Sequence, residues 1–443
     1  MQHATSAAHL TNVNSTMSDT GFGTITLLLF VLLSSAHILG HLFTRLRQPR
    51  VAGEILAGLL LGPVVLGRLF PAVTIAFADA GTSSVLGFVY NLGLVLLMFS
   101  SGAETHGLFG KSDRRQVGVL GLVGTGVPFL VALLGARFLP TEPLAGSTGQ
   151  GVPLTLVLAI AVAVTSIPVI SKILHDLGIL NTRFARLVLG VAVLEDIGLW
   201  AVLALATALA KSQNAPQYHI VAHLLVTVAY FGLGLFAAPM LLNRLTRARW
   251  NILAQTSPIG YVVVVLFAYV AAAALLDVSL VFAAFLAGFA MANDSEVVRP
   301  SIESVSKFAF AVFVPMYFAV VGYRLELRHG VPLALLAVFL AGSCALKLFA
   351  AGLGARLAGF DGWGSLNLAA ALNARGGPGI VLASVAFDAG VINASFYTVL
   401  VISAVLTSQA AGAWLDHVLK SGRPLLGRST RGAEAVKPLE EAA

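Results

Sequence analysis

The chain has 443 residues, of which 58% are hydrophobic and only 11% are charged, and its mean hydropathy is +0.90. A soluble domain carries about 25% charged residues, so this composition excludes a soluble globular protein. The net charge of +7 then indicates basic loops on one side of a membrane rather than nucleic-acid binding, and the single cysteine excludes an intrachain disulfide framework.

Long apolar runs recur along the whole chain, which predicts an all-α polytopic membrane protein with about 13 transmembrane helices. A polar tail at 1–23 precedes the predicted transmembrane domain at 24–417, and a short tail at 418–443 follows it. The first tail lacks the basic start and cleavage site of a signal peptide, so we interpret it as mature protein. The predicted segments are 24–43, 52–66, 85–100, 117–138, 153–176, 185–209, 219–241, 258–275, 278–293, 305–321, 332–355, 366–388 and 393–417.

Basic residues alternate between the two sides of these segments. With thirteen segments, 20 of the 27 Lys and Arg residues fall on one side, and that side includes the C-terminal tail. Because cytoplasmic loops are enriched in Lys and Arg, this pattern places the C-terminus in the cytoplasm and the N-terminus outside. The composition, rich in Ala and Gly, favours the inner membrane of a bacterium.

Four ionisable side chains fall near the middle of predicted segments. Glu195 and Asp196 lie in the sixth segment, within VAVLEDIGLW, while Lys347 lies in the eleventh and Arg375 in the twelfth. A charge at the bilayer centre costs about 2.5–3.5 kcal/mol, so such residues face a bundle interior, pair with one another or carry ions. The alternatives are a purely structural ion pair, and an Arg375 that only stabilises the ends of broken helices.

Adjacent residues on a helix point about 100° apart, so Glu195 and Asp196 cannot face the same way. One acid is expected to face a water-filled cavity and the other a neighbouring helix. This arrangement predicts a division of labour, in which one carboxylate binds a cation and the other holds a basic partner.

Two segments are predicted to be broken at mid-depth. In the fifth, Pro168 cannot donate a backbone hydrogen bond, and Thr165 and Ser166 offer oxygens at the same depth. An unwound helix in a membrane is tolerated where it lines a cavity or is buried, although an ordinary proline kink is the alternative. The twelfth segment is interrupted by Asn373, Arg375, Gly376, Gly377 and Pro378.

The breaks occupy corresponding places in the two halves of the chain. Segments four to six align with segments eleven to thirteen, and EILAGLLLGP in the second segment echoes VFAAFLAGFAMAND in the ninth. This organisation predicts two inverted repeats with crossed broken helices. Half-helices place dipole ends at mid-membrane, which Arg375 and the acids would compensate. We interpret the glycines of GVLGLVGTG, at 118–126, as helix-packing contacts rather than a nucleotide loop.

Over roughly 24–417, the sequence resembles the monovalent cation/proton antiporter superfamily, in the branch of bacterial sodium/proton antiporters and potassium efflux systems. The motifs that carry the resemblance are ILAGLLLGPVVLG at 55–67, TSIPVISKIL at 165–174, LEDIGLW at 194–200, Lys347, and NARGGPGIVLASVAFDAGVI at 373–392.

The resemblance implies a homodimer, with a moving core at about 117–209 and 332–417 and a dimerisation unit in the remainder. By position, Asp196 matches the essential ion-binding aspartate, and Thr165 and Ser166 match the unwound segment beside the ion. Lys347 matches the lysine that pairs with the residue preceding that aspartate, which is Glu195 here. Many sodium exchangers have two aspartates at this place, so the Glu-Asp pair leaves the stoichiometry open.

The implied function is exchange of a monovalent cation for protons by alternating access, with both competing for Asp196. Na⁺ is favoured and K⁺ is possible. The expected partners are the cation, protons, membrane lipid and a second copy of the chain. We expect no cofactor, no enzymatic activity and no nucleic acid. We also expect no nucleotide-binding regulatory domain, since only about 26 residues follow the last segment.

Three alternative functions fit the sequence less well. An organic-anion/sodium symporter on the same fold is the main alternative, although the intramembrane acids favour a cation as substrate. A cation channel does not usually need paired broken helices. An intramembrane protease would need a Ser/His pair, and His175 lies near the end of a segment while Ser166 lies near the middle of it.

Overall fold

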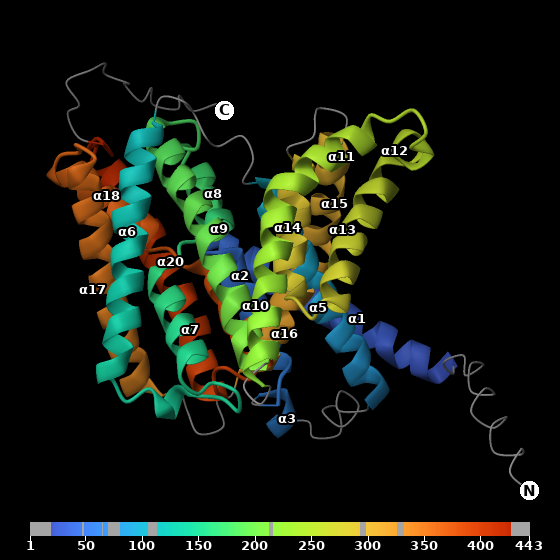
Figure 1. Cartoon of the computed structure of the whole chain (residues 1–443). Coiled ribbons are helices and arrows are strands. Elements are labelled where there is room, and N and C mark those ends of the chain that lie inside the picture. Colours follow the sequence, from blue (N-terminus) through green and yellow to red (C-terminus); the bar gives the residue numbers. More distant parts are fainter. Residues whose placement is uncertain are drawn as a thin grey trace, which may run out of the picture.

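The computed structural model describes residues 19–46, 48–63, 65–69, 80–104, 113–211, 216–292, 298–325 and 332–426. Within these ranges the regular structure is helical, and each of the predicted segments overlaps a helix or a pair of helices (Figure 1). The longer helices are α1 (Asp19–Arg45), α2 (Arg50–Leu61), α5 (Ala80–Glu104), α6 (Arg114–Gly135), α7 (Val152–Ala163), α8 (Ile167–Asp176), α9 (Arg183–Lys211), α10 (Gln217–Gly232), α11 (Ala238–Thr246), α13 (Pro258–Leu275), α14 (Leu280–Ala292), α15 (Arg299–Ala311), α16 (Phe313–Tyr323), α17 (Leu333–Leu357), α18 (Gly362–Leu372), α19 (Gly376–Asp388) and α20 (Ala394–Lys420). The short ones are α3 (Leu66–Leu69), η1 (Ala136–Phe138), η2 (Glu142–Leu144), η3 (Leu233–Ala237) and α12 (Ile252–Thr256).

The predicted count of thirteen spans is not confirmed. Among the described residues, 10 helices are long and apolar enough to cross a membrane, and α18 with α19, bent by 40°, makes up to 11. The two remaining segments form α2, with 12 residues, and α14, with 13 residues. Helix α1 begins at Asp19, inside the predicted 1–23 tail, while 1–18 and 427–443 lie outside the described residues.

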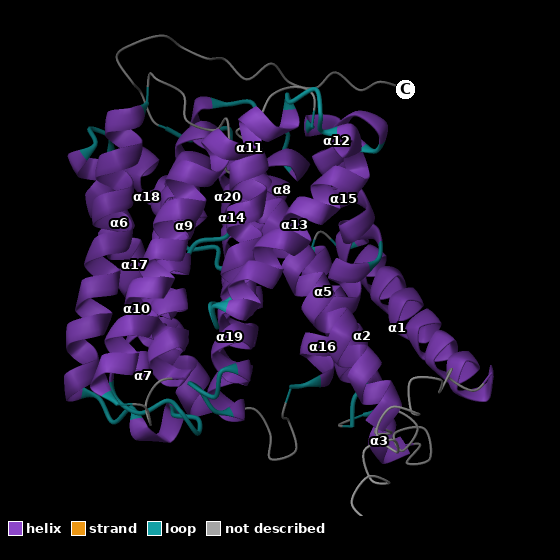
Figure 2. Cartoon of the chain, turned by 45° about the vertical axis from the view of Figure 1, so that its right-hand side comes forward, coloured by secondary structure: helices purple, strands orange, loops and turns teal. Residues whose placement is uncertain are grey.

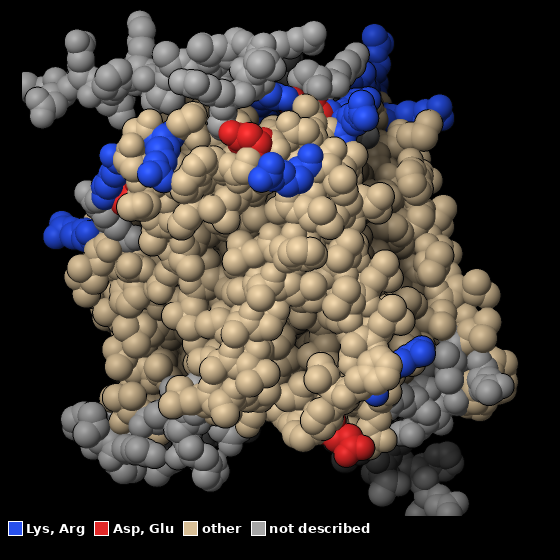
Figure 3. All heavy atoms as spheres, turned by 90° about the vertical axis from the view of Figure 1, so that its left-hand side faces the viewer, with Lys and Arg blue, Asp and Glu red and all other residues tan. Residues whose placement is uncertain are grey.

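The apolar surface forms a band between two polar ends. The helices run between two layers of loops (Figure 2), and Lys and Arg gather at the end where α6 and α9 begin (Figure 3). We call this the basic end, and the other the opposite end. On the face shown in Figure 3, a wide belt without charged side chains lies between the two ends, as lipid tails require. The chain is therefore an integral membrane protein.

The helices form two bundles (Figure 1). Bundle A contains α6–α9 and α17–α20, and bundle B contains α1, α2, α5 and α13–α16. Helix α10, η3 and α11 run between them, and α9 packs against α14 where the bundles meet. Bundle A covers the two stretches of sequence that the resemblance assigns to a moving core.

Inside bundle B, α2 and α16 cross so closely that only glycine fits at the crossing. A Cβ atom added to Gly58 would lie 1.6 Å from the carbonyl oxygen of Ala319. On the facing helix, a Cβ at Gly322 would lie 1.9 Å from the carbonyl oxygen of Ile55. Each helix thus presents a glycine to the backbone of the other, which is how membrane helices pack without a hydrophobic driving force.

Helices α5 and α14 cross in the same way. A Cβ at Gly102 would lie 2.0 Å from the carbonyl oxygen of Phe285, and one at Gly288 would lie 1.9 Å from that of Phe99. Both crossings therefore hold two rigid backbones in direct contact.

The two crossings are related by the inverted repeat. The glycine of ILAG at 55–58 contacts the first residue of AVVG at 319–322, and the glycine of FLAG at 285–288 contacts the first residue of FSSG at 99–102. On each of the four helices, the glycine lies three residues after the residue whose carbonyl oxygen contacts the glycine of the partner helix. This shared register makes α2 the counterpart of α14 and α5 the counterpart of α16, as the echo between the second and ninth segments predicts.

Replacing Gly58 by Ala is expected to destabilise the fold, because the added carbon cannot be accommodated by moving a side chain. Overpacking of this kind costs about 1–3 kcal/mol. Thermal unfolding of the detergent-solubilised protein should show a lower midpoint for Gly58→Ala. The matched control is Gly87→Ala in α5, where a Cβ meets nothing within 4 Å. Equal midpoints for the two variants would contradict the close crossing.

Candidate ion-binding site

Two unwound segments cross inside bundle A. The chain between α7 and α8, at 164–166, hydrogen-bonds the chain between α18 and α19, at 373–375. The amide of Ser166 donates to the carbonyl of Ala374 over 2.7 Å, and the hydroxyl of Thr165 donates to the carbonyl of Leu372 over 2.5 Å. All four residues are buried, and each unwound segment is stabilised by its hydrogen bonds to the other.

The prolines explain why these hydrogen bonds are available. In a continuous helix the carbonyl of Ala374 would accept from residue 378, but Pro378 has no amide hydrogen. The amide of Ser166 takes its place. Pro168 lies in the first turn of α8, where a missing donor is tolerated, and Ser166 caps that helix by accepting from the amide of Val169 over 3.3 Å.

Helix α19 begins against α8 at Gly376, whose φ of +38° disfavours other residues. A Cβ here would lie 2.4 Å from Val169 Cγ2. The amide of Gly376 donates to the hydroxyl of Ser408 over 3.0 Å, and the amide of Arg375 donates to the hydroxyl of Thr407 over 3.3 Å. Gly377 and Pro378 are buried in the first turn of the same helix.

Lys347 and Glu195 form a fully buried ion pair. Lys347 Nζ lies 2.9 Å from Glu195 Oε1, and the two side chains are 0% and 1% exposed. Lys347 also donates to the carbonyl of Ala163, the last residue of α7, over 2.5 Å. Its positive charge therefore compensates both the carboxylate and the negative end of a half-helix. The hydroxyl of Thr125 on α6 donates to the same Glu195 oxygen.

Asp196 points in a different direction from Glu195. It is 0% exposed and lies beside Ser101 of α5 and Trp200 of its own helix, so it sits where bundle A meets bundle B. Neither carboxylate oxygen accepts a hydrogen bond from a described residue. A buried carboxylate in this state is neutralised by a proton or by a cation, because burial disfavours the bare charge.

Arg375 is also buried, at 2% exposed, and its guanidinium makes no hydrogen bond to a described residue. Its Cζ lies 5.7 Å from the centre of the Phe339 ring on α17. The side-chain oxygen of Asn373 is buried and likewise unbonded within the described parts of the chain. Compensation of helix ends by Arg375 stays a prediction, since no bond to a carbonyl accompanies it.

The predicted site residues thus form two groups. Thr165 and Ser166 meet the start of α19 at the crossing. Lys347 links this crossing to Glu195 through its bonds to the carbonyl of Ala163 and to the Glu195 carboxylate. Asp196 lies on the other face of α9. Within the described ranges, no cluster of three His, Cys, Asp or Glu residues could hold a metal ion. Binding of a cation by Asp196, with Thr165 and Ser166 as further ligands, stays a prediction.

Several contacting residues were not predicted from the sequence. Thr125 was interpreted only through the glycines around it, and Ser101 and Trp200 were not singled out. Each is a polar group within an apolar segment, and Trp200 follows Asp196 by four residues, which is one helical turn. These two signals, polarity at depth and helical spacing, would have identified all three.

Comparisons with known proteins identify the family of the chain. The family described as sodium/hydrogen exchanger, transmembrane, matches residues 28–421. A K⁺/H⁺ antiporter of Saccharomyces cerevisiae is 27% identical over 83% of this chain, which spans only 43% of the yeast protein. The Na⁺/H⁺-K⁺ antiporter GerN of Bacillus cereus is 26% identical over 87% of this chain and 94% of its own length.

A solved structure shares the fold. The sodium proton antiporter MjNhaP1 of Methanocaldococcus jannaschii superimposes with a TM-score of 0.67, covering 92% of this chain and 100% of that one at 13% identity. With the family match over most of the transmembrane region, the crossed broken helices and the buried Glu-Asp pair, the chain belongs to the sodium/hydrogen exchanger family.

Proposed function

We propose that this protein is a secondary active antiporter, which exchanges a monovalent cation for protons by alternating access. The observation that carries the proposal is Asp196, a fully buried carboxylate that lies beside Ser101 and Trp200 but has no basic partner within the described ranges, at the junction of two helix bundles. Such a group binds either a proton or a cation but not both. Competition for one site couples the two fluxes without any other energy source.

The relatives support a cation and its exchange for protons. Their names specify Na⁺/H⁺ and K⁺/H⁺ antiport, which favours antiport over organic-anion symport and over a channel. Between the two ions we favour Na⁺, with K⁺ as the second candidate. No step of this cycle needs an enzymatic reaction or a cofactor.

The basic end is proposed to face the cytoplasm of a bacterium, because positively charged loops are retained there. This orientation places the N-terminus outside. We also propose a homodimer, with bundle A moving against a bundle B that is held by its partner and by lipid. The outer faces of α1 and α13 support this view, since they expose large apolar side chains such as Phe30, Ile38 and Phe267.

Asp196→Asn is expected to abolish exchange while leaving a folded protein, because the amide is isosteric but binds neither a proton nor a cation. The measurement is recovery of a pH-sensitive dye in proteoliposomes titrated with Na⁺, Li⁺, K⁺ and Rb⁺. Asp416→Asn on α20 is the matched control and should remain active, since Asp416 pairs with exposed Lys420. Appreciable exchange by Asp196→Asn at any pH between about 6 and 9 would rule out the assignment.

The Lys347–Glu195 pair is expected to make transport electrogenic, through release of a proton from Lys347 or entry of Glu195 into the cation's ligand shell. Removing one partner of a buried pair costs about 3–5 kcal/mol, so the informative variant is Glu195→Gln with Lys347→Gln. In the unmodified protein, the set point of Na⁺/H⁺ exchange should shift with a membrane potential that is clamped by valinomycin. In the double variant, the set point should not depend on the potential. If the set point of the unmodified protein does not change with the membrane potential, the pair is structural.

Replacing Thr165 and Ser166 together by Ala is expected to raise the apparent KM for the cation more than it lowers the maximal rate. The reason is loss of two oxygens beside the crossing, whereas Asp196 remains. Thr165→Ser retains a hydroxyl and serves as the control. An unchanged KM in the double variant would restrict these residues to supporting the helix break.

A further inference from the structure

A cluster of polar contacts joins the bundles at the opposite end, between α19 of bundle A and two helices of bundle B. Arg324 Nη1 lies 2.8 Å from Asp388 Oδ1, and the hydroxyl of Tyr90 donates to Asp388 Oδ2 over 2.8 Å. The Cζ atom of Arg324 lies 4.0 Å from the centre of the Tyr90 ring. Both carboxylate oxygens of Asp388 are thus held by bundle B. We call these three residues the latch.

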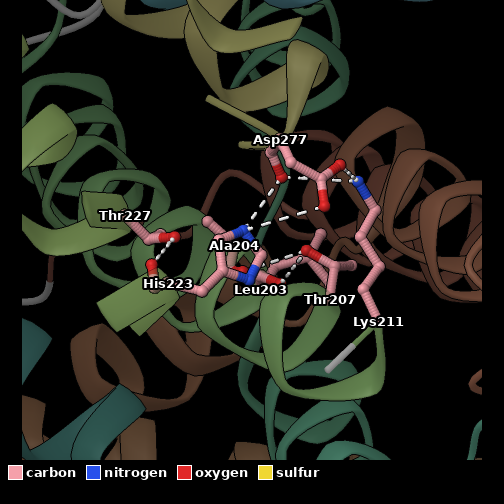
Figure 4. Close-up of polar contacts among 7 residues, drawn as sticks. All are labelled: Leu203, Ala204, Thr207, Lys211, His223, Thr227 and Asp277. Atoms are coloured by element: carbon pink, nitrogen blue, oxygen red, sulfur yellow. Dashed lines mark hydrogen bonds and ion pairs between the residues drawn. The ribbon is translucent and has the colours of Figure 1, made fainter. Parts of the chain in front are cut away.

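A second ion pair joins the bundles at the same end. Lys211, the last residue of α9, lies 2.6 Å from Asp277 Oδ1, and Asp277 stands between α13 and α14 of bundle B. Figure 4 shows Lys211 and His223 both pointing toward Asp277. Asp277 has a φ of +56°, which is unfavourable for a residue other than glycine and is supported here by these contacts.

Two further hydrogen bonds join described residues of the two bundles toward the same end. Beyond the two ion pairs, Tyr317 bonds Ser384 over 3.1 Å, and Tyr397 donates to the carbonyl of Val321 over 3.2 Å. At the basic end the ion pairs stay within one bundle, as in Arg183–Asp113 and Lys172–Asp176 of bundle A and Arg50–Glu54 of bundle B. The bundles are therefore fastened at the opposite end.

The inverted repeat identifies the counterpart of Arg324 at the basic end. Gly102 and Gly322 occupy the same place in the two glycine crossings, so the residues two positions later, Glu104 and Arg324, also correspond. Glu104 is exposed at the end of α5. It makes no ion pair with a described residue.

The same reasoning identifies the counterpart of Asp388. Helices α8 and α19 end in matching turns, HDLGI at 175–179 and FDAGV at 387–391, in which Gly178 and Gly390 both have φ of +71°. In each turn the glycine amide donates over 2.9 Å to the carbonyl three residues earlier. Asp176 therefore corresponds to Asp388. By this correspondence, the counterparts of Arg324 and Asp388 at the basic end are two acids, Glu104 and Asp176.

We propose that this charge asymmetry favours the conformation in which the latch closes the opposite end, so that Asp196 is loaded from the basic end. The inference rests on the proposed antiport function, in which the two repeats exchange conformations during the cycle. Closing the basic end would bring two carboxylates together, and Lys172, already paired with Asp176, only partly offsets their repulsion. Opening the opposite end must separate Arg324 from Asp388.

The test uses a cysteine reporter beneath the latch. Cys344, the only cysteine, is replaced by Ala, and Ser384→Cys supplies a buried thiol between the bundles. Proteoliposomes are then treated with a membrane-impermeant maleimide. Arg324→Asp should label about fivefold faster than the parent, because loss of an ion pair shifts a two-state equilibrium by about that factor. Adding Asp388→Arg restores an attractive pair and should return labelling to the parental rate.

A variant at the far end separates the proposal from local loosening. Glu104→Lys gives the basic end an attractive partner for Asp176, so it should also accelerate labelling of the reporter. Arg299→Asp, which disrupts an exposed pair within bundle B, is the matched control and should have no effect. Parental labelling in Arg324→Asp or in Glu104→Lys, or no rescue by the charge swap, would overturn the proposal. Labelling requires no transport, so an inactive parent with these labelling rates would refute only the antiport function.

Discussion

The buried ion pair between Lys347 and Glu195 is the interaction on which the site depends. Neither charge is stable alone at this depth, because the bilayer core offers no water to solvate it. Together they satisfy each other, and Lys347 has a further donor for the carbonyl end of α7. One amino group therefore fixes α17, α9 and the broken helix relative to one another. Its use by Glu195 also leaves the neighbouring carboxylate without a basic partner among the described residues, and that carboxylate is Asp196.

Backbone satisfaction imposes the second constraint. A break in a membrane helix exposes carbonyls and amides that lipid cannot bind, so each break must be matched by another group. Here Pro378 has no amide hydrogen, so the carbonyl of Ala374 lacks its helical donor. The amide of Ser166, from the other broken helix, donates to that carbonyl instead. In the same way, the hydroxyl of Thr165 donates to the carbonyl of Leu372. The two breaks are thus mutually required, which is why they occur in corresponding segments of the two repeats.

Much of this organisation could be predicted from the sequence, because it is recorded in local patterns. Apolar length located the helices, prolines located the breaks, and charges in apolar segments located Glu195, Asp196 and Lys347. The number of spans was predicted less accurately, since α2 and α14 are apolar but short, and hydropathy alone does not define where a helix ends. The latch could not be predicted from the sequence. Arg324 and Asp388 stand at segment ends 64 positions apart, where an ionisable residue is unremarkable, and only the fold brings them within 2.8 Å.

In the proposed antiport, the position of Asp196 would couple the two fluxes strictly. Its helix, α9, packs on α14 of bundle B, whose residues near the contact are largely apolar and buried. Bundle B is itself held by glycine crossings with backbone in direct contact, so it cannot yield to let a charge pass. A bare carboxylate moving along this junction would meet the same energetic penalty as one in lipid, whereas a protonated or cation-bound carboxylate would not. In the proposed cycle, movement would therefore be restricted to the proton-loaded and cation-loaded states, because an empty, charged site would have to be desolvated.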